Sequence, residues 1–317
     1  MALENAQFLQ ADTGDAMRMK WVVGFLTLLF LGNTYVMAET ETTCERVDGA
    51  IKIYEIGSNP VKDTAGNAGD ACKELPDNYK INIFRFGLCT ADPYNATNDL
   101  ESCSFLVKSD TGVSHEIAYP AKADMATNSQ LENGTYSHMI LVLENKLGVK
   151  HTEEFDTVLY GKTGSGKKCW TIDSTTAYAG QRSGVVQASP ATPAMDCGDT
   201  PVPAYTYEIF DSMGEGGEDA VFAGAGEGGF EMPAGTMRAK LLKADLTAAT
   251  NFENAGRLLA AITLKKTKTV DASTTGFEIK FKMTDSVSVD LSYDEDNDRV
   301  YATKLGADPF QVDLIIK

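Results

Sequence analysis

Apolar and polar residues alternate along the C-terminal part of the chain. Apolar side chains occupy every second position in residues 277–283 (FEIKFKM), 287–293 (VSVDLSY) and 310–316 (FQVDLII). A period of two directs one face of an extended strand toward a core and the other toward water. Residues 257–270 (RLLAAITLKKTKTV) are predicted as a further strand, with a short helix over 258–264 as the alternative. Short strands separated by polar turns favour an antiparallel meander in a sandwich or barrel.

The N-terminal part carries strand patterns that are less regular. Its candidate strands are residues 79–89, 103–108, 114–119, 136–143, 155–160 and 169–173. The two helix candidates, residues 69–75 and 122–132, are short. We therefore predict an all-β protein built from two tandem antiparallel β-sandwich-like domains, with few short helices.

A proline-rich segment predicts the boundary between these domains. Four of the ten prolines lie in the sequence PATPAMDCGDTPVP, and no cysteine follows Cys197. We expect a disulfide-bearing β domain at residues 39–200 and a cysteine-free β-meander domain at residues 201–317.

Residues 1–38 have the order of parts that is typical of a secretory signal peptide. A short basic segment (MRMK, 17–20) precedes an apolar core (WVVGFLTLLFL, 21–31) and a small-residue exit at Ala38. The core is shorter than the roughly 20 residues that a transmembrane helix needs. The polar residues before Met17 are interpreted as a spurious or extra extension, because a signal needs none of them. The alternative is an uncleaved N-terminal anchor with a short cytoplasmic tail.

The six cysteines all follow this segment, and their number is even. In an oxidising compartment, an even number of cysteines indicates disulfides. Sequence alone does not select a pairing, and we take the nearest-neighbour one: Cys44–Cys72, Cys89–Cys103 and Cys169–Cys197. The signal and the cysteines predict a secreted, periplasmic or cell-surface location, or a virion if the chain is viral.

The chain is strongly acidic, with 45 Asp and Glu against 28 Lys and Arg and a formal net charge of −17. Such a surface repels nucleic acid and anionic membranes. We expect protein or glycan partners or self-assembly, no nucleic acid, and no membrane association once the signal segment is removed.

The segment GKTGSGKK, residues 161–168, is close to a phosphate-binding loop. That loop requires Ser or Thr after its Gly-Lys pair, to hold Mg²⁺, and a helix behind it. Lys168 stands at the hydroxyl position and a β-prone run follows. We therefore predict a hairpin turn that binds no nucleotide.

Three other patterns are incomplete. Asp110-Thr111-Gly112 lacks the second aspartate that an aspartic protease needs, and it is predicted as a hairpin turn. Residues 224–229 satisfy G-x-G-x-x-G, but acidic neighbours would repel a pyrophosphate, so an acidic loop is expected. Glu153, Glu154 and Asp156 form an acidic cluster close to His151, which a solvated strand edge explains as well as a catalytic role does.

Asp294, Asp296 and Asp298 lie at alternate positions, as in a calcium loop. An EF-hand would need Gly and Glu where Arg299 and Leu305 stand. The sequence favours a polar turn, with a loose Ca²⁺ site as the alternative and no other cofactor expected. The sequons at Asn95 and Asn133 matter only if the source glycosylates exported proteins.

Residues 310–317 form a terminal strand whose apolar face must be buried somewhere. Pairing with the neighbouring residues 300–305 is expected, and exchange of the strand between subunits is the alternative.

No catalytic constellation is complete. The sequence therefore predicts an exported, non-enzymatic β-sandwich protein of a cell surface or extracellular structure, acting in adhesion, assembly or display. A viral structural protein (a spike, fibre or capsid decoration) is one alternative. A secreted glycan-binding protein or hydrolase is the other, although only Trp170 of the two tryptophans follows the signal segment.

The signal-peptide interpretation predicts that the mature chain begins at Glu39, because the apolar core leads into Val36-Met37-Ala38. N-terminal sequencing of the protein purified from its source should read from Glu39. A purified protein that retains residues 1–16 would contradict both cleavage and a late translation start.

Overall fold

The computed structural model describes residues 43–54, 60–69, 71–94, 100–118, 130–178, 180, 182–211, 230–283, 286–308 and 310–317. Nearly all regular structure in these residues is β-strand, which confirms the all-β prediction. The only helical element that they contain is the 3₁₀ helix η1, Phe252–Asn254. None of the described helical structure is long and apolar enough to cross a membrane.

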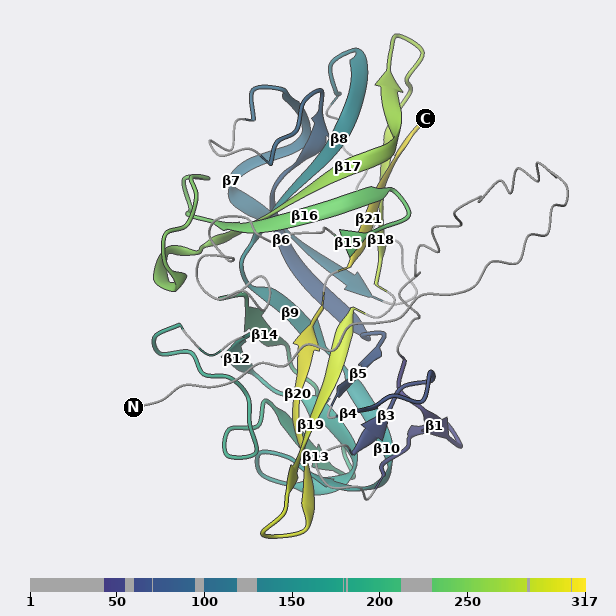
Figure 1. Ribbon diagram of the computed structural model, residues 1–317, viewed down its shortest axis with the longest axis vertical. Helices are drawn as coiled ribbons and strands as arrows, with labels where there is room; N and C mark the ends of the chain where they lie inside the picture. The colour runs from purple at the N-terminus through teal and green to yellow at the C-terminus, as the bar shows by residue number, and fades with distance from the viewer. Residues whose placement is uncertain are drawn as a thin grey trace, which may run out of the picture. The chain divides into compact units, whose positions relative to one another are not determined.

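One sheet has nine strands in the order β12-β14-β9-β6-β8-β17-β16-β15, with β7 paired to β6 (Figure 1). β6 is central to this sheet. One of its edges pairs first with β9 and then with β8, and its other edge pairs with β7. The strands of this sheet are β6 Asn78–Cys89, β7 Cys103–Ala118, β8 Gly134–Glu144, β9 Leu147–Lys150, β12 Ser174–Ala177, β14 Thr206–Ile209, β15 Phe230–Glu231, β16 Gly235–Leu242 and β17 Arg257–Val270.

The other large sheet has eight strands in the order β1-β2-β10-β20-β19-β5, and β11 pairs with both β10 and β13. Its strands are β1 Arg46–Val47, β2 Ala50–Ile51, β5 Ala71–Glu74, β10 Thr152–Tyr160, β11 Ser165–Thr171, β13 Met195–Gly198, β19 Val287–Asp294 and β20 Arg299–Ala307. Two small antiparallel pairs complete the described strands: β3 Val61–Lys62 with β4 Ala68–Gly69, and β18 Phe277–Lys282 with β21 Gln311–Ile316.

Strands from both sides of residue 200 share the two large sheets. β17 pairs with β8 in one sheet, while β20 pairs with β10 and β19 with β5 in the other. Residues Glu39–Lys317 accordingly form one compact unit. The predicted tandem sandwiches at 39–200 and 201–317 are therefore not confirmed.

One helix prediction was wrong. Residues 69–75 do not form a helix, because Ala71–Glu74 is β5 and pairs antiparallel with Val287–Asp290 of β19. Most of the other helix candidate, residues 122–132, lies outside the described residues, which resume at residue 130. Residues 257–270 form the strand β17 rather than a helix.

The main core joins both large sheets and the β18–β21 pair. Its fully buried members include Tyr79 and Phe86 from the nine-stranded sheet, Phe155 and Leu291 from the eight-stranded sheet, and Leu314 from β21. A smaller cluster covers the opposite face of the nine-stranded sheet, where Phe84, Ile140, Val142 and Leu259 are buried. Strands buried on both faces lose their alternation, which explains the continuous apolar run at the end of β8.

The three predicted disulfides are all present: Cys44–Cys72, Cys89–Cys103 and Cys169–Cys197. The last two connect residues that face each other directly across neighbouring strands, β6 with β7 and β11 with β13. No described cysteine is free.

The C-terminal strand β21 is paired within the chain, but not with residues 300–305 as predicted. It pairs antiparallel with β18, Phe277 facing Ile316, because β20 is already paired with β19 along its length. Its apolar face is buried as expected, with Phe310, Val312 and Leu314 in the main core. The Lys268 ammonium bonds to the Asp313 carboxylate and to the Leu314 carbonyl, which ties β21 to β17.

We expect Leu314→Ala to lower the free energy of unfolding by about 2–5 kcal/mol, because it leaves a cavity at a fully buried position. Ile315→Ala is the matched control, since its side chain is only partly buried. Urea unfolding of both variants measures the difference. Equal losses would show that β21 is not packed on its Leu314 face.

Candidate functional site

A row of polar and aromatic side chains crosses the nine-stranded sheet on its outer face. Tyr207 of β14 stands opposite Gly148 of β9, which stands opposite Lys80 of β6, which in turn stands opposite Glu116 of β7. The adjacent residues Tyr79, Val149, Thr206 and Glu208 point the other way and are buried. Side-chain alternation therefore presents this row to solvent.

Gly148 makes room for the Tyr207 ring. A Cβ at this position would lie 2.9 Å from an atom of that ring and 3.1 Å from the Lys80 Cβ. The missing side chain lets the ring and the lysine stem approach each other over the backbone of β9. The glycine thus sets how closely the Tyr207 ring and the Lys80 side chain approach each other.

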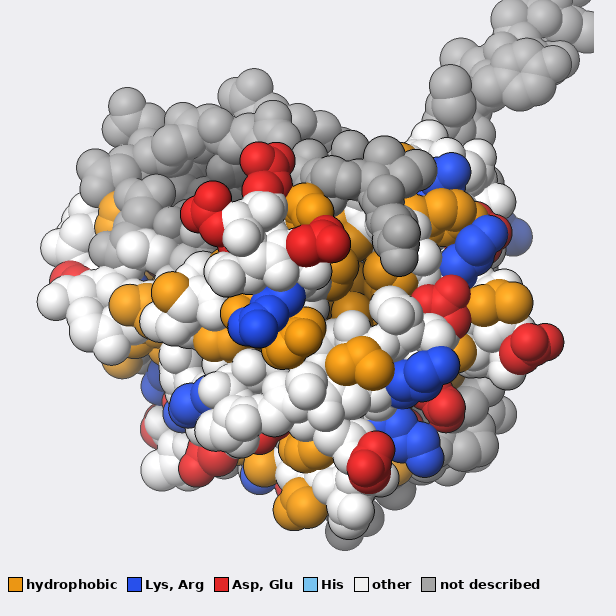
Figure 2. All heavy atoms as spheres, turned by 90° about the horizontal axis from the view of Figure 1, so that it is seen from below, with side chains coloured by type: hydrophobic (Ala, Val, Ile, Leu, Met, Phe, Trp, Pro, Cys, Tyr) orange, Lys and Arg blue, Asp and Glu red, His pale blue; other side chains and the backbone are white. Residues whose placement is uncertain are grey.

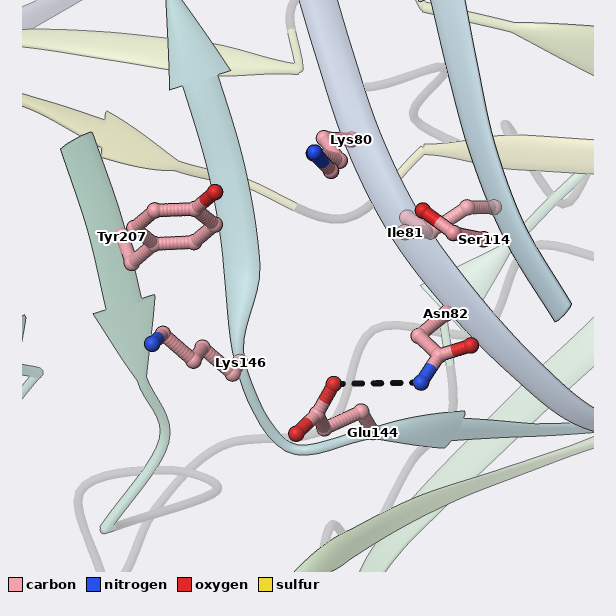
Figure 3. A pocket seen from close by; sticks show the side chains of 7 residues that line it. All are labelled: Lys80, Ile81, Asn82, Ser114, Glu144, Lys146 and Tyr207. Carbon is pink, nitrogen blue, oxygen red and sulfur yellow. Dashed lines mark hydrogen bonds between the residues drawn. The ribbon is translucent and has the colours of Figure 1, made fainter. Parts of the chain in front are cut away.

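A hollow of about 200 Å³ opens beside this row (Figure 3). Seven residues from β6, β7, β8, β14 and the β8–β9 turn line it: Lys80, Ile81, Asn82, Ser114, Glu144, Lys146 and Tyr207. The Asn82 amide donates a hydrogen bond of 3.3 Å to the Glu144 carboxylate at its rim. The volume is below the range of about 300–1,000 Å³ typical of pockets that enclose drug-sized ligands.

The lysines of this face lie against tyrosine rings. The Lys146 ammonium is 4.5 Å from the Tyr207 ring centroid, and those of Lys80 and Lys150 are 5.2 and 5.1 Å from that of Tyr205. Such cation–π contacts hold an ammonium group while leaving its N–H donors available. Burial, and then the Glu116 charge, raise the pKa of Tyr205 to about 12, so its hydroxyl remains a donor at neutral pH. We call Lys80, Lys146, Lys150, Tyr205 and Tyr207 the Tyr–Lys face.

A second hollow, of about 510 Å³, lies over β19 and β20 and includes Tyr178, Asp290 and Lys304 in its lining. Below it, the Lys304 ammonium bonds to Glu208 at 2.6 Å and lies 3.4 Å from Asp290. Burial raises the pKa of the Asp290 carboxyl to about 6, although Lys304 opposes the shift. Burial alone would lower the pKa of Lys304, but the Glu208 and Asp290 charges outweigh it and raise the pKa.

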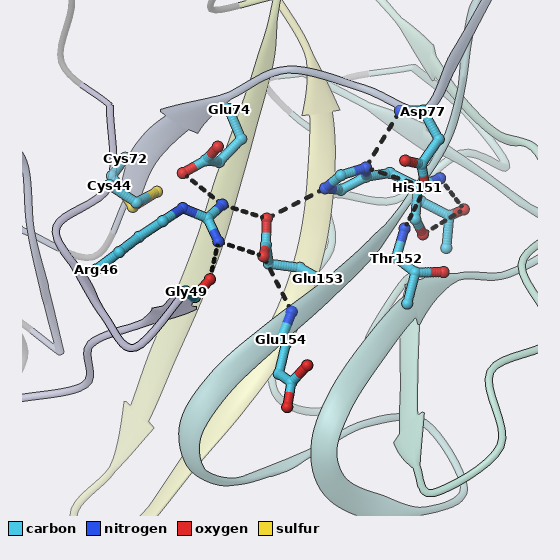
Figure 4. Close-up of polar contacts among 11 residues, drawn as sticks. Cys44, Arg46, Gly49, Cys72, Glu74, Asp77, His151, Thr152, Glu153 and Glu154 are labelled. Atoms are coloured by element: carbon cyan, nitrogen blue, oxygen red, sulfur yellow. Dashed lines mark hydrogen bonds and ion pairs between the residues drawn. A yellow bond between two sulfur atoms is a disulfide. The ribbon is translucent and has the colours of Figure 1, made fainter. Parts of the chain in front are cut away.

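A third polar cluster joins β1, β5 and β10 (Figure 4). The Arg46 guanidinium donates to both carboxylate oxygens of Glu153, at 3.0 and 2.9 Å, and pairs with Glu74 at 2.9 Å. The His151 ring lies between Glu153 and Asp77, at 3.2 and 3.3 Å. The Cys44–Cys72 disulfide lies beside the Arg46 and Glu74 end of this cluster (Figure 4).

The interpretation of this region as a solvated strand edge was wrong for Glu153, whose side chain is only 6% exposed. His151 is also buried. The sequence contained a usable signal: Glu153 and Phe155 share one face of β10, His151 precedes them at the same spacing of two, and Phe155 is apolar. The cluster resembles a carboxylate–histidine pair of an enzyme, but the nearby Thr171 hydroxyl is bonded to the Ala204 carbonyl and not to the imidazole.

The segment GKTGSGKK forms the predicted hairpin turn. Gly161–Gly164 connects β10 to β11, and a strand rather than a helix follows. The Asp196 carboxylate accepts hydrogen bonds from the Thr163 and Gly164 amides, at 3.0 and 2.8 Å. A carboxylate thus occupies amide donors that a phosphate would require.

The prediction for Asp110-Thr111-Gly112 was wrong, because β7 continues through it. Register shifts between Ile83 and Arg85 of β6 leave these residues as a bulge in one long strand. Gly112 takes a positive φ of 83° there, and the exposed Asp110 pairs with Arg85 at 2.9 Å. The G-x-G-x-x-G motif at 224–229 and the sequon at Asn95 lie outside the described residues, whereas Asn133 is exposed just before β8.

Asp294, Asp296 and Asp298 lie at the hairpin between β19 and β20. The Asp294 carboxylate accepts hydrogen bonds from the Asp296 backbone amide and the Asn297 side chain. The Asp298 carboxylate accepts a hydrogen bond from the Tyr293 hydroxyl. Among the described residues, no group of three or more His, Cys, Asp or Glu could hold a metal ion. Asp294 and Asp298 thus accept hydrogen bonds from groups of the same hairpin.

His151 makes stability dependent on pH. Burial alone would lower the pKa of His151, but its hydrogen bonds to Asp77 and Glu153 outweigh burial and raise it to about 9. The stabilisation is fully present below its ordinary pKa of 6.5 and is lost as pH rises toward 9. We expect the stability difference between wild type and His151→Gln to shrink by about 3 kcal/mol across this window.

Urea unfolding at several pH values measures that difference, and His115→Gln is the control. Burial lowers the pKa of His115, so the contribution of His115 must not decline as pH rises. A His151→Gln difference that is constant over the window would contradict the raised pKa.

No family model matches the chain, and neither does any curated protein or any solved structure.

Proposed function

We propose that this chain is an exported, non-enzymatic β-sandwich protein of a cell surface or extracellular structure, working in adhesion, assembly or display. The observation that carries the proposal is the set of three disulfide bonds on an all-strand scaffold. Disulfides persist in oxidising compartments and are rare in the cytosol. The signal-like order of residues 1–38 supports the same location.

A binding role agrees with where the polar groups lie. Lys80, Lys150 and Tyr207 of the Tyr–Lys face stand on paired strands, and sites on strands hold their side chains more rigidly than sites on loops. Its hollow is shallow and open, as expected for contact with part of a larger partner. On the side of the molecule in Figure 2, acidic, basic and apolar side chains are interspersed rather than gathered into one patch.

A second candidate, a secreted glycan-binding protein, is favoured by the same face. Tyrosine rings, lysine ammoniums and the Asn82–Glu144 pair are the groups that recognise sugar rings, acidic substituents and hydroxyls. The overall charge of −17 argues against nucleic acid as the partner in either case.

Export is tested by fusing residues 1–38 to alkaline phosphatase, which folds only where its own disulfides can form. We expect phosphatase activity outside the cytosol, because the apolar core drives translocation. Leu28→Asp with Leu29→Asp in the same fusion is the matched control and should abolish activity. An inactive fusion with the natural residues 1–38 would overturn the proposal.

A further inference from the structure

We infer that the hollow of the Tyr–Lys face binds a uronate residue of an acidic polysaccharide. This inference rests on the proposed function, since it names the ligand class that an exported binding protein would take at this face.

The positive charge beside the hollow favours an anionic ligand. The hollow is flanked by the ammonium groups of Lys80 and Lys146, which come from β6 and from the turn before β9 (Figure 3). Among the described residues, the carboxylate that pairs with Lys80 is Glu116, at 3.2 Å, whose side chain is 54% exposed. Exposed pairs of this kind contribute little, so Lys80 can turn toward a ligand carboxylate. In the part of the chain that the structure describes, the Lys146 ammonium has no carboxylate partner.

The position of these lysines on an otherwise acidic protein also favours an anionic ligand. A chain with a net charge of −17 repels polyanions over most of its surface. The Tyr–Lys face carries three lysines against Glu116 and Glu144, so it has an excess of positive charge. A polyanion can therefore approach here more easily than over an acidic surface.

Glu144 excludes a simple anion such as phosphate and favours a ligand that also carries hydroxyls. Its carboxylate points into the hollow beside the Asn82 amide (Figure 3). Together they present two acceptors and a donor, which match vicinal hydroxyls of a sugar ring. A uronate carries its carboxylate and its hydroxyls on one ring, and Lys80 lies across the hollow from the Asn82–Glu144 pair (Figure 3).

The Tyr–Lys face extends beyond the hollow, which leaves room for a second residue of a polymer. Tyr205 lies next to Tyr207, with ring centroids 6.2 Å apart, and Lys150 covers it. A second pairing of aromatic ring and ammonium thus lies beside the first, immediately before β14. Neighbouring uronate residues of one chain would meet the same chemistry twice.

Calorimetry of the purified, disulfide-intact protein tests the inference with three probes: trigalacturonate, a hyaluronan hexasaccharide and an alginate trimer. We expect at least one to bind, more weakly as salt is raised. The methyl ester of the bound probe, which removes only the charge, should not bind. Absence of binding to all three, or equal binding of the ester, would overturn the inference.

Variants locate the site. Lys80→Gln with Lys146→Gln should weaken binding roughly tenfold or more, because two charge-assisted hydrogen bonds are lost. Lys52→Gln is the matched control, since Lys52 also lies over a tyrosine ring, 4.4 Å from that of Tyr54, but on a different surface. Unchanged binding in the double variant would overturn the assignment, and thermal unfolding checks that each variant is folded.

The Glu144→Gln variant distinguishes binding of a uronate from binding of a zwitterionic peptide. Glutamine keeps an acceptor for sugar hydroxyls and removes a negative charge near the ligand, so uronate binding should be retained or strengthened. A ligand ammonium would need the carboxylate. Binding of dialanine that disappears in Glu144→Gln, without uronate binding, would replace the inference with peptide recognition. The phosphatase fusion decides export independently of these results.

Discussion

The ion pair between Lys304 and Glu208 joins the two large sheets through the interior. Taking each charge out of water costs several kcal/mol, so neither residue is tolerated there without the other. Glu208 also accepts a hydrogen bond of 2.6 Å from the Ala307 amide, which fixes β14 against the end of β20. Because side chains alternate along a strand, an inward Glu208 requires an outward Tyr207. A buried pair thus sets the position of the exposed Tyr–Lys face.

The N-terminal strands depend on a similar arrangement. β1 and β5 are short, and little apolar area can hold them. Arg46 connects them through Glu74 and Glu153, and the Cys44–Cys72 disulfide adds a covalent link beside the same charges. The bidentate geometry of Arg46 on Glu153 is specific as well as strong. Charge pairs and a disulfide therefore replace packing where the core is thin.

Several elements could be predicted because their determinants are local. Residues 277–283 and 287–293 alternate since each has one buried face, and the hairpin at 161–164 follows from glycines between two strand patterns. β5 could not be predicted, because it becomes a strand only by pairing with β19, far away in sequence. The Tyr–Lys face was missed for a related reason. Lys80, Lys146 and Tyr207 are ordinary solvent-facing residues until four strands bring them together.

The interleaving of the sheets has a consequence for how the chain matures. β19 separates β5 from β20 in the eight-stranded sheet, so this sheet stays incomplete until residues near 307 are available. Pairings of such high sequence separation form late and slowly. The strands that are synthesised first, such as β5, therefore lack their pairing partners while synthesis continues. A chain exported as proposed would cross the membrane before it folds, and its disulfides would close during assembly of the sheets on the far side.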